Sequence, residues 1–158
     1  MRTIHLNRRG ARTLRENLIG NQAGYDFLDL QRLDHLAKGL TEIQGEYGER
    51  MAVLAREEKQ IRRQIARGQD VGLNNVGLIN IAYEVEDLDA EAEAVDVCFV
   101  VEDGDYNLIK NKLDAQENWL ANDEIRHVIL GMIEAVNNAE KGEIDGSEAK
   151  TVKQFRRK

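Results

Sequence analysis

The strongest pattern in the chain is a seven-residue spacing of apolar side chains between positions 25 and 67. The positions that follow it are Leu33, Leu40, Tyr47, Leu54 and Ile61. Met51 and several other apolar residues lie at three- or four-residue offsets between them. The chain has no proline to force a break, so the spacing predicts one long, coiled-coil-like helix. A helix of about 40 residues would measure roughly 60 Å, and we expect it to project or to pair.

Three glycines interrupt this pattern and leave two interpretations open. Each of Gly39, Gly45 and Gly48 costs a helix about 1 kcal/mol relative to alanine. They indicate either a bend in one long helix or a break, near Gly45 to Gly48, between two helices that form an antiparallel hairpin. We favour the single helix because the heptad spacing continues through all three glycines.

Alternation of apolar and polar residues predicts the strands. It is brief at 2–7, which is typical of a short edge strand, and clearer at 79–86 and 95–101. We expect the last two to form an antiparallel pair, joined by a polar loop or a single helical turn. The glycine-containing stretch 68–75 is expected to be a turn, and 11–19 a short amphipathic helix.

The C-terminal third predicts two further helices. One extends over 106–116 and a second, more strongly amphipathic helix begins at the N-capping Asn122 and ends at Gly142. The predicted fold is therefore a mainly helical α+β fold, in which these two helices cover a small antiparallel sheet. We expect one folding unit with three parts: 1–67, a compact half at 68–142, and a basic tail at 143–158.

Charge is distributed unevenly along this chain of 158 residues, which has 22 basic and 29 acidic side chains. The three stretches 1–67, 68–149 and 150–158 carry +4, −16 and +5, so opposite charges are expected to meet within one molecule or between neighbours. We predict an acidic docking surface at Glu86, Asp87, Asp89, Glu91 and Glu93. The predicted basic docking residues are Arg8, Arg9, Arg12, Lys153, Arg156, Arg157 and Lys158.

No residue pattern predicts catalysis, a metal or a cofactor. The stretch 103–107 opens like a calcium loop but lacks the glycine and the glutamate that such a loop needs, so it is interpreted as a turn between a strand and a helix. The three histidines are isolated, and we expect a structural role for His127. Cys98 is expected to be buried among acidic neighbours, which disfavour a thiolate. No apolar run is long enough to span a membrane, and no secretory signal is recognised at the N-terminus.

The order of these elements resembles that of small accessory or structural proteins of tailed bacteriophages. The segments that carry the resemblance are Ile4-His5-Leu6-Asn7-Arg8, the charged helix from Leu33 to Ile65, the run from Asp105 to Leu113, and Val128 to Asn138. The resemblance implies a minor virion component or a host-modulating factor, in the virion or the host cytoplasm. It supplies no active-site residue.

The predicted function is that of a non-enzymatic structural or assembly protein that forms homo-oligomers or docks on other virion proteins. An exposed helical seam would be costly in water, so we predict that it carries the association. Its residues are Leu33, Leu40, Tyr47, Met51, Leu54 and Ile61. The alternative is an acidic inhibitor or regulatory module that binds a basic host protein. A nucleic-acid role for the basic ends is less favoured, and an enzyme least.

Overall fold

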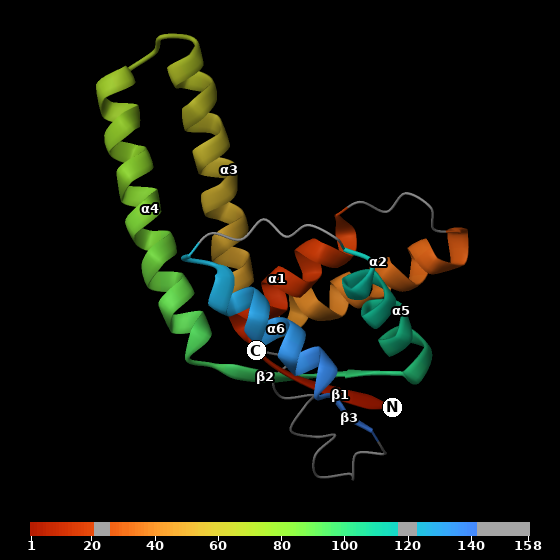
Figure 1. Cartoon of the computed structure of the whole chain (residues 1–158). Coiled ribbons are helices and arrows are strands. Elements are labelled where there is room, and N and C mark those ends of the chain that lie inside the picture. The colour runs from red at the N-terminus through yellow and green to blue at the C-terminus, as the bar shows by residue number, and fades with distance from the viewer. Residues whose placement is uncertain (21–25, 117–122, 142–158) are drawn as a thin grey trace.

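The fold is a mainly helical α+β arrangement, seen in a computed structural model that describes residues 1–20, 26–116 and 123–141 (Figure 1). These ranges contain six helices and a small antiparallel sheet. In chain order the elements are β1 (Arg2–Asn7), α1 (Arg8–Ile19), α2 (Phe27–Gln44), α3 (Glu46–Ala66), α4 (Val71–Glu93), β2 (Asp96–Val101), α5 (Asp103–Asp114), α6 (Arg126–Asn137) and β3 (Glu140–Lys141). The prediction of a mainly helical α+β fold is confirmed.

The sheet is built around the N-terminal strand. β1 pairs antiparallel with β2, and Ile4 lies opposite Phe99. The two-residue β3 pairs with the other edge of β1, so β1 is the middle strand and the prediction of an edge strand at 2–7 is wrong in that respect. The alternation at 95–101 correctly predicted β2 and its inward residues, because Val97 and Val101 are buried.

The predicted strand at 79–86 is wrong, and so is its pairing with 95–101. This segment belongs to α4, a continuous helix of 23 residues. Ile81, Val85, Leu88 and Ala92 recur at three- and four-residue intervals and turn one helical face toward α3. Of the four residues that alternate in the predicted strand, Ile81 and Val85 lie on this helical face, whereas Ile79 and Tyr83 lie on the opposite, exposed face. The segment forms a helix because the longer helical spacing buries a continuous apolar stripe of α4 against α3. The predicted turn at 68–75 is correspondingly shorter and ends where α4 begins.

The predicted single long helix is two helices, which separate at Gly45. Its backbone has φ 59° and ψ −139°, a conformation that only glycine adopts without strain. Gly39 lies within α2 for another reason: a Cβ there would lie 3.0 Å from the Phe99 ring, so glycine allows the helix to approach β2 closely. The alternative interpretation is confirmed in its break near Gly45. It is wrong in its pairing, since α3 forms its antiparallel hairpin with α4 and not with α2 (Figure 1).

The main hydrophobic core lies between the sheet and four helices. Its residues come from both long strands and from α1, α2, α5 and α6. The predicted cover of the sheet by the two C-terminal helices is not confirmed, because α1 and α2 pack on the sheet beside α6, and α5 packs mainly on other helices. α1 is fixed at its start by the Asn7 side chain, which accepts a hydrogen bond from the Gly10 backbone N–H at 2.6 Å. The Asn122 cap and the tail at 143–158 lie outside the described residues.

The premise that the heptad residues form an exposed seam is wrong. Leu33 and Leu40 have no exposed surface and belong to the main core. Leu54 is buried as well, and Tyr47 and Met51 lie in a second, smaller cluster between α3 and α4. Ile61 is half-buried. The breaks at Gly45 and at the turn before α4 fold this apolar stripe back on other segments of the same chain, so it does not offer a ready surface to a second subunit.

Candidate protein-binding arm

Helices α3 and α4 form an antiparallel hairpin, here called the arm, that projects from the rest of the fold (Figure 1). The turn at its tip contains two residues with positive φ, Gly68 at 72° and Asp70 at 41°. The two helices approach closely near the tip, where a Cβ on Gly77 would lie 3.2 Å from the Ile61 side chain. Among the described residues, the arm contacts the body mainly at its base, where α4 packs on α1 and α3 follows α2 (Figure 1).

A network of polar side chains anchors the base of the arm to the body. Arg9 of α1 contacts two carboxylates of α4, Glu93 at 2.5 Å and Asp89 at 3.5 Å. Asp89 also accepts a hydrogen bond from the Tyr47 hydroxyl at 2.7 Å, and Glu93 lies 2.7 Å from His127 Nε2 on α6. Four helices thus meet in one network, which sets the direction in which the arm leaves the body.

The network shifts the pKa values of two of its members. Burial and the nearby Asp89 carboxylate raise the pKa of Tyr47 well above its usual range. Burial by itself would raise the pKa of Glu93, but the hydrogen bonds with Arg9 and His127 outweigh it and hold this pKa below its usual value. Glu93 is consequently a fixed negative charge at neutral pH, and it attracts Arg9 across the junction.

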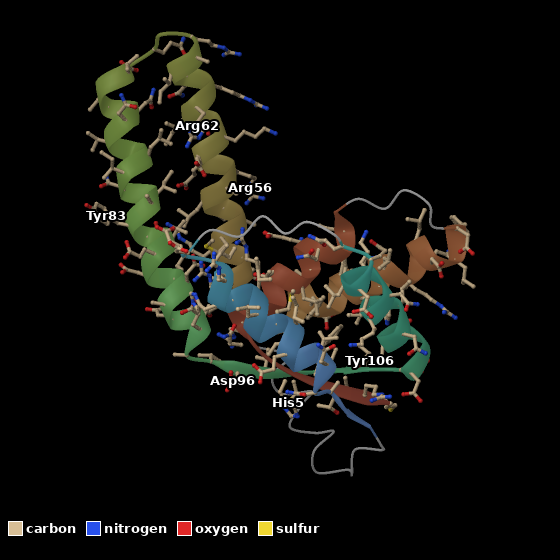
Figure 2. All side chains as sticks on the ribbon, viewed as in Figure 1. His5, Arg56, Arg62, Tyr83, Asp96 and Tyr106 are labelled. Carbon is tan, nitrogen blue, oxygen red and sulfur yellow. The ribbon has the colours of Figure 1, made fainter. Side chains whose placement is uncertain are left out.

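One face of α4 carries large apolar side chains away from α3. Leu73, Val76, Ile79 and Tyr83, here called the apolar edge, are 77%, 54%, 55% and 65% exposed. At 100° per residue they fall within about a third of the helix circumference. Figure 2 shows Tyr83 pointing away from the arm on the side opposite α3. Single exposed apolar residues are ordinary, but four on one face of one helix form a patch of the kind that binds other proteins.

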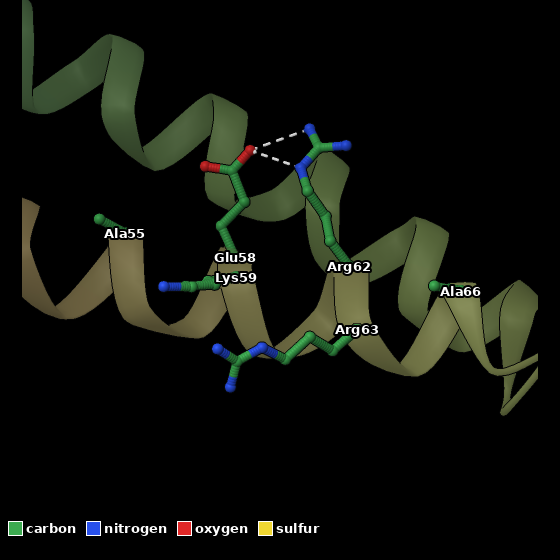
Figure 3. A pocket seen from close by; sticks show the side chains of 6 residues that line it. All are labelled: Ala55, Glu58, Lys59, Arg62, Arg63 and Ala66. Atoms are coloured by element: carbon green, nitrogen blue, oxygen red, sulfur yellow. Dashed lines mark hydrogen bonds and ion pairs between the residues drawn. The ribbon is translucent and has the colours of Figure 1, made fainter.

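The outer face of α3 is basic instead. Arg56, Lys59 and Arg63 recur at three- and four-residue intervals and are exposed. Figure 2 shows Arg56 on the side of α3 that faces away from α4. Beside these residues lies a shallow hollow, in which the Arg62 guanidinium donates two hydrogen bonds to Glu58, at 2.9 and 3.1 Å (Figure 3). The residues that line the hollow all belong to α3.

The structure divides the predicted acidic docking surface into two groups. Asp89 and Glu93 are bound within the chain by Arg9, whereas Glu86, Asp87 and Glu91 are exposed.

The predicted basic residues are divided in the same way. Arg9 belongs to the network, Arg12 pairs with Glu16 at 3.2 Å, and Arg8 is half-buried. Lys153, Arg156, Arg157 and Lys158 lie outside the described residues. Opposite charges therefore meet inside this molecule at Arg9, which is one of the two outcomes that the charge distribution predicted.

Sequence reasoning missed the apolar edge. The signal was present, because Val76, Ile79 and Tyr83 follow helical spacing. It was hidden because Ile79 and Tyr83 were interpreted as the inward residues of a strand. As a consequence, exposed and buried positions were exchanged in the prediction: Tyr47, Met51 and Leu54 of α3 were expected to be exposed and are buried, and Ile79 and Tyr83 of α4 were expected to be buried and are exposed.

One other place brings together two side chains that could carry chemistry. The Cys98 Sγ lies 3.3 Å from His5 Nδ1 across the β1–β2 pair, and Cys98 is half-exposed where burial was predicted. Within the described residues, no three or more histidine, cysteine or carboxylate side chains gather in a way that could hold a metal ion. Nor does any helix there have the length and hydropathy needed to cross a membrane.

The chain matches no family model, no curated protein and no solved structure.

Proposed function

We propose that the protein is a non-enzymatic structural or assembly protein that binds other proteins through its arm. The observation that supports this best is the apolar edge, which lies on a part of the molecule that extends into solvent. Burial of such side chains contributes roughly 25 cal/mol per Å² of apolar surface removed from water. The proposal assigns to Leu73, Val76, Ile79 and Tyr83 the binding role that the heptad spacing predicted for other residues.

The shape of the molecule agrees with this role. An arm anchored by Arg9, Asp89, Glu93 and His127 presents its outer faces at some distance from the body, where a partner can reach them without disturbing the main core. The resemblance to accessory proteins of tailed bacteriophages suggests where such an arm would act, namely within a virion or in its assembly. Catalysis forms no part of this proposal.

The alternative function, an acidic module that binds a basic protein, has less support. Glu86, Asp87 and Glu91 are exposed and could contact a basic surface. However, Asp89 and Glu93 are already paired with Arg9 and so contribute less to any such contact. The acidic residues at the base of the arm therefore serve in part to hold the fold together.

Site-specific photo-cross-linking in the cells that naturally make the protein tests the proposal. A photoreactive phenylalanine analogue at Tyr83 is expected to form covalent adducts with protein, because this side chain would lie in the interface. The matched control places the same analogue at Leu130 of α6, which is 59% exposed but outside the arm. Equal yields at the two positions, or no adduct at either, would contradict binding through the arm.

A further inference from the structure

We propose that the outer face of α3 binds the phosphate backbone of a double-stranded nucleic acid. The residues that make the contacts are Arg56, Lys59, Arg63 and Arg67, here called the basic stripe. All four are exposed. The basic stripe lies on a different helix from the apolar edge, so this inference goes beyond the proposed binding of proteins and does not depend on it.

The four cations of the basic stripe lie on one side of α3. At 100° per residue they fall within about 80° of the helix circumference, and they extend over about 16 Å at 1.5 Å per residue. Figure 2 shows Arg56 on the side of α3 that faces away from α4. Figure 3 shows Arg63 extending away from the Glu58–Arg62 pair. The stripe therefore presents a line of positive charge to the solvent.

The basic stripe differs from other basic residues of α3 in having no acidic partner. Arg50 pairs with Glu84 at 2.7 Å, and Arg62 pairs with Glu58 at 2.9 Å. Within the part of the chain that the structure describes, no side chain of the basic stripe forms an ion pair. The carboxylates of the arm thus leave the charge of the stripe uncompensated.

Neighbouring residues of the helix add to this excess of positive charge. No acidic residue stands three or four positions before or after Arg56, Lys59 or Arg63. At these distances Lys59 has three cations as neighbours, which are Arg56, Arg62 and Arg63. Like charges at this spacing repel one another and destabilise a helix, so the stripe does not serve the stability of the arm. A bound polyanion would remove the repulsion.

The side chains around the stripe favour phosphates over a protein surface as the partner. They are short or polar, namely Ala52, Ala55, Gln60 and Ala66. A protein interface has a more apolar core, in which charged residues are depleted. Phosphates need only exposed donors, and an arginine guanidinium can donate two parallel hydrogen bonds to one phosphate. The composition of this face therefore fits a nucleic-acid backbone better than another protein.

The length of the stripe matches a short piece of duplex. Duplex DNA carries a phosphate about every 3.4 Å on each strand, so the stripe lies along about five base pairs. The chain as a whole has a net charge of −7, and the acidic half of α4 from Glu84 to Glu93 repels phosphates. Contact is thus limited to the outer part of the arm. We expect weak binding that does not depend on base sequence, with a dissociation constant on the order of 10 µM at low salt.

Fluorescence anisotropy of a labelled DNA duplex, mixed with the full chain, tests the binding. Four phosphate contacts predict a roughly hundredfold loss of affinity between about 50 and 200 mM salt, because each contact releases condensed counterions. Two duplexes of unrelated sequence should bind equally well. Absence of binding at the lower salt concentration, or an affinity that salt does not change, would overturn the inference.

Two double variants that remove the same charge test the assignment to the stripe. Lys59→Gln with Arg63→Gln should weaken binding at least about tenfold at low salt and reduce the salt slope by about 2. The control, Lys38→Gln with Arg126→Gln, removes two exposed cations of the body and should change the affinity less than about twofold. Equal losses would mean that net charge governs binding, and the stripe would lose its role. Circular dichroism verifies that both variants are folded.

An acidic polypeptide is the other kind of polyanion that four cations in a line could bind. Polyglutamate carries roughly one charge per 3.5 Å of extended chain, about half the density of duplex DNA. We therefore expect it to bind at least about tenfold more weakly than a duplex of equal total charge. Polyglutamate that binds as tightly as the duplex, and that is lost in Lys59→Gln with Arg63→Gln, would assign the stripe to an acidic protein and contradict the proposal.

Discussion

The body and the arm of this molecule use the same kinds of apolar side chain in opposite ways. In the body, leucines such as Leu14 and Leu40 have no exposed surface and pack among four helices and a sheet. In the outer part of the arm, one helical face packs on its neighbour while the apolar edge remains in water. A two-helix hairpin can bury only one face of each helix, so the opposite face is available to a partner.

The largest expected effect is on the free energy of unfolding, and it is measured with a matched pair of substitutions, one in the body and one in the arm. Leu40→Ala removes a fully buried side chain and should lower the free energy of unfolding by about 2–5 kcal/mol. Leu73→Ala changes a side chain that is 77% exposed and should lower it by less than about 0.5 kcal/mol. Urea denaturation of dilute, monomeric protein measures both. Similar losses for the two variants would mean that the apolar edge is part of the monomer's stability, and the contrast between body and arm would fail.

Gly45 is the point at which the chain passes from body to arm, and it provides the next largest effect. Gly45→Ala forces a side chain into a backbone conformation with φ 59° and ψ −139° and should lower stability by about 1–3 kcal/mol. Gly72→Ala is the control, because this helical glycine has open space around its Cβ position. That substitution should be neutral or stabilise by up to about 1 kcal/mol, through helix propensity. Thermal unfolding shows whether each substitution lowers or raises the stability of the chain.

The body could be predicted from the sequence to a much greater extent than the arm. The strands at β1 and β2 and the helices α1, α5 and α6 were expected near their observed positions, because each buries one face with a clear period against a large core. The heptad run was recognised but its partner was not. Whether residues 27–66 form one rod or two helices depends on a single glycine conformation, which the heptad pattern does not reveal.

The candidate site was least predictable for a related reason. In the arm, Ile79, Ile81, Tyr83 and Val85 satisfy an alternating pattern as well as a helical one, and only contact with α3 decides which of them are buried. The pairing of Arg9 with Asp89 and Glu93 joins positions about 80 residues apart in the chain. Charge totals predicted that opposite charges would meet, but only the fold determines which side chains do so.

A smaller effect tests the junction between the two regions through pH. The pKa of Glu93 is held below its usual value in the folded chain, so its ionised form contributes stability at neutral pH. That contribution is present above the unfolded pKa and is lost as pH falls through the lower, folded pKa. Glu93→Gln should therefore reduce stability at pH 7 and flatten its decline in acid.

The control for the pH prediction is a neighbour on the same helix. Glu91 is exposed, so Glu91→Gln should leave both the stability at pH 7 and its acid dependence close to those of the unchanged chain. Denaturant midpoints measured between about pH 3 and pH 7 provide the comparison, because this range covers the ordinary titration of a glutamate. Parallel curves for the unchanged chain and for Glu93→Gln would show that Arg9 and His127 do not stabilise this carboxylate.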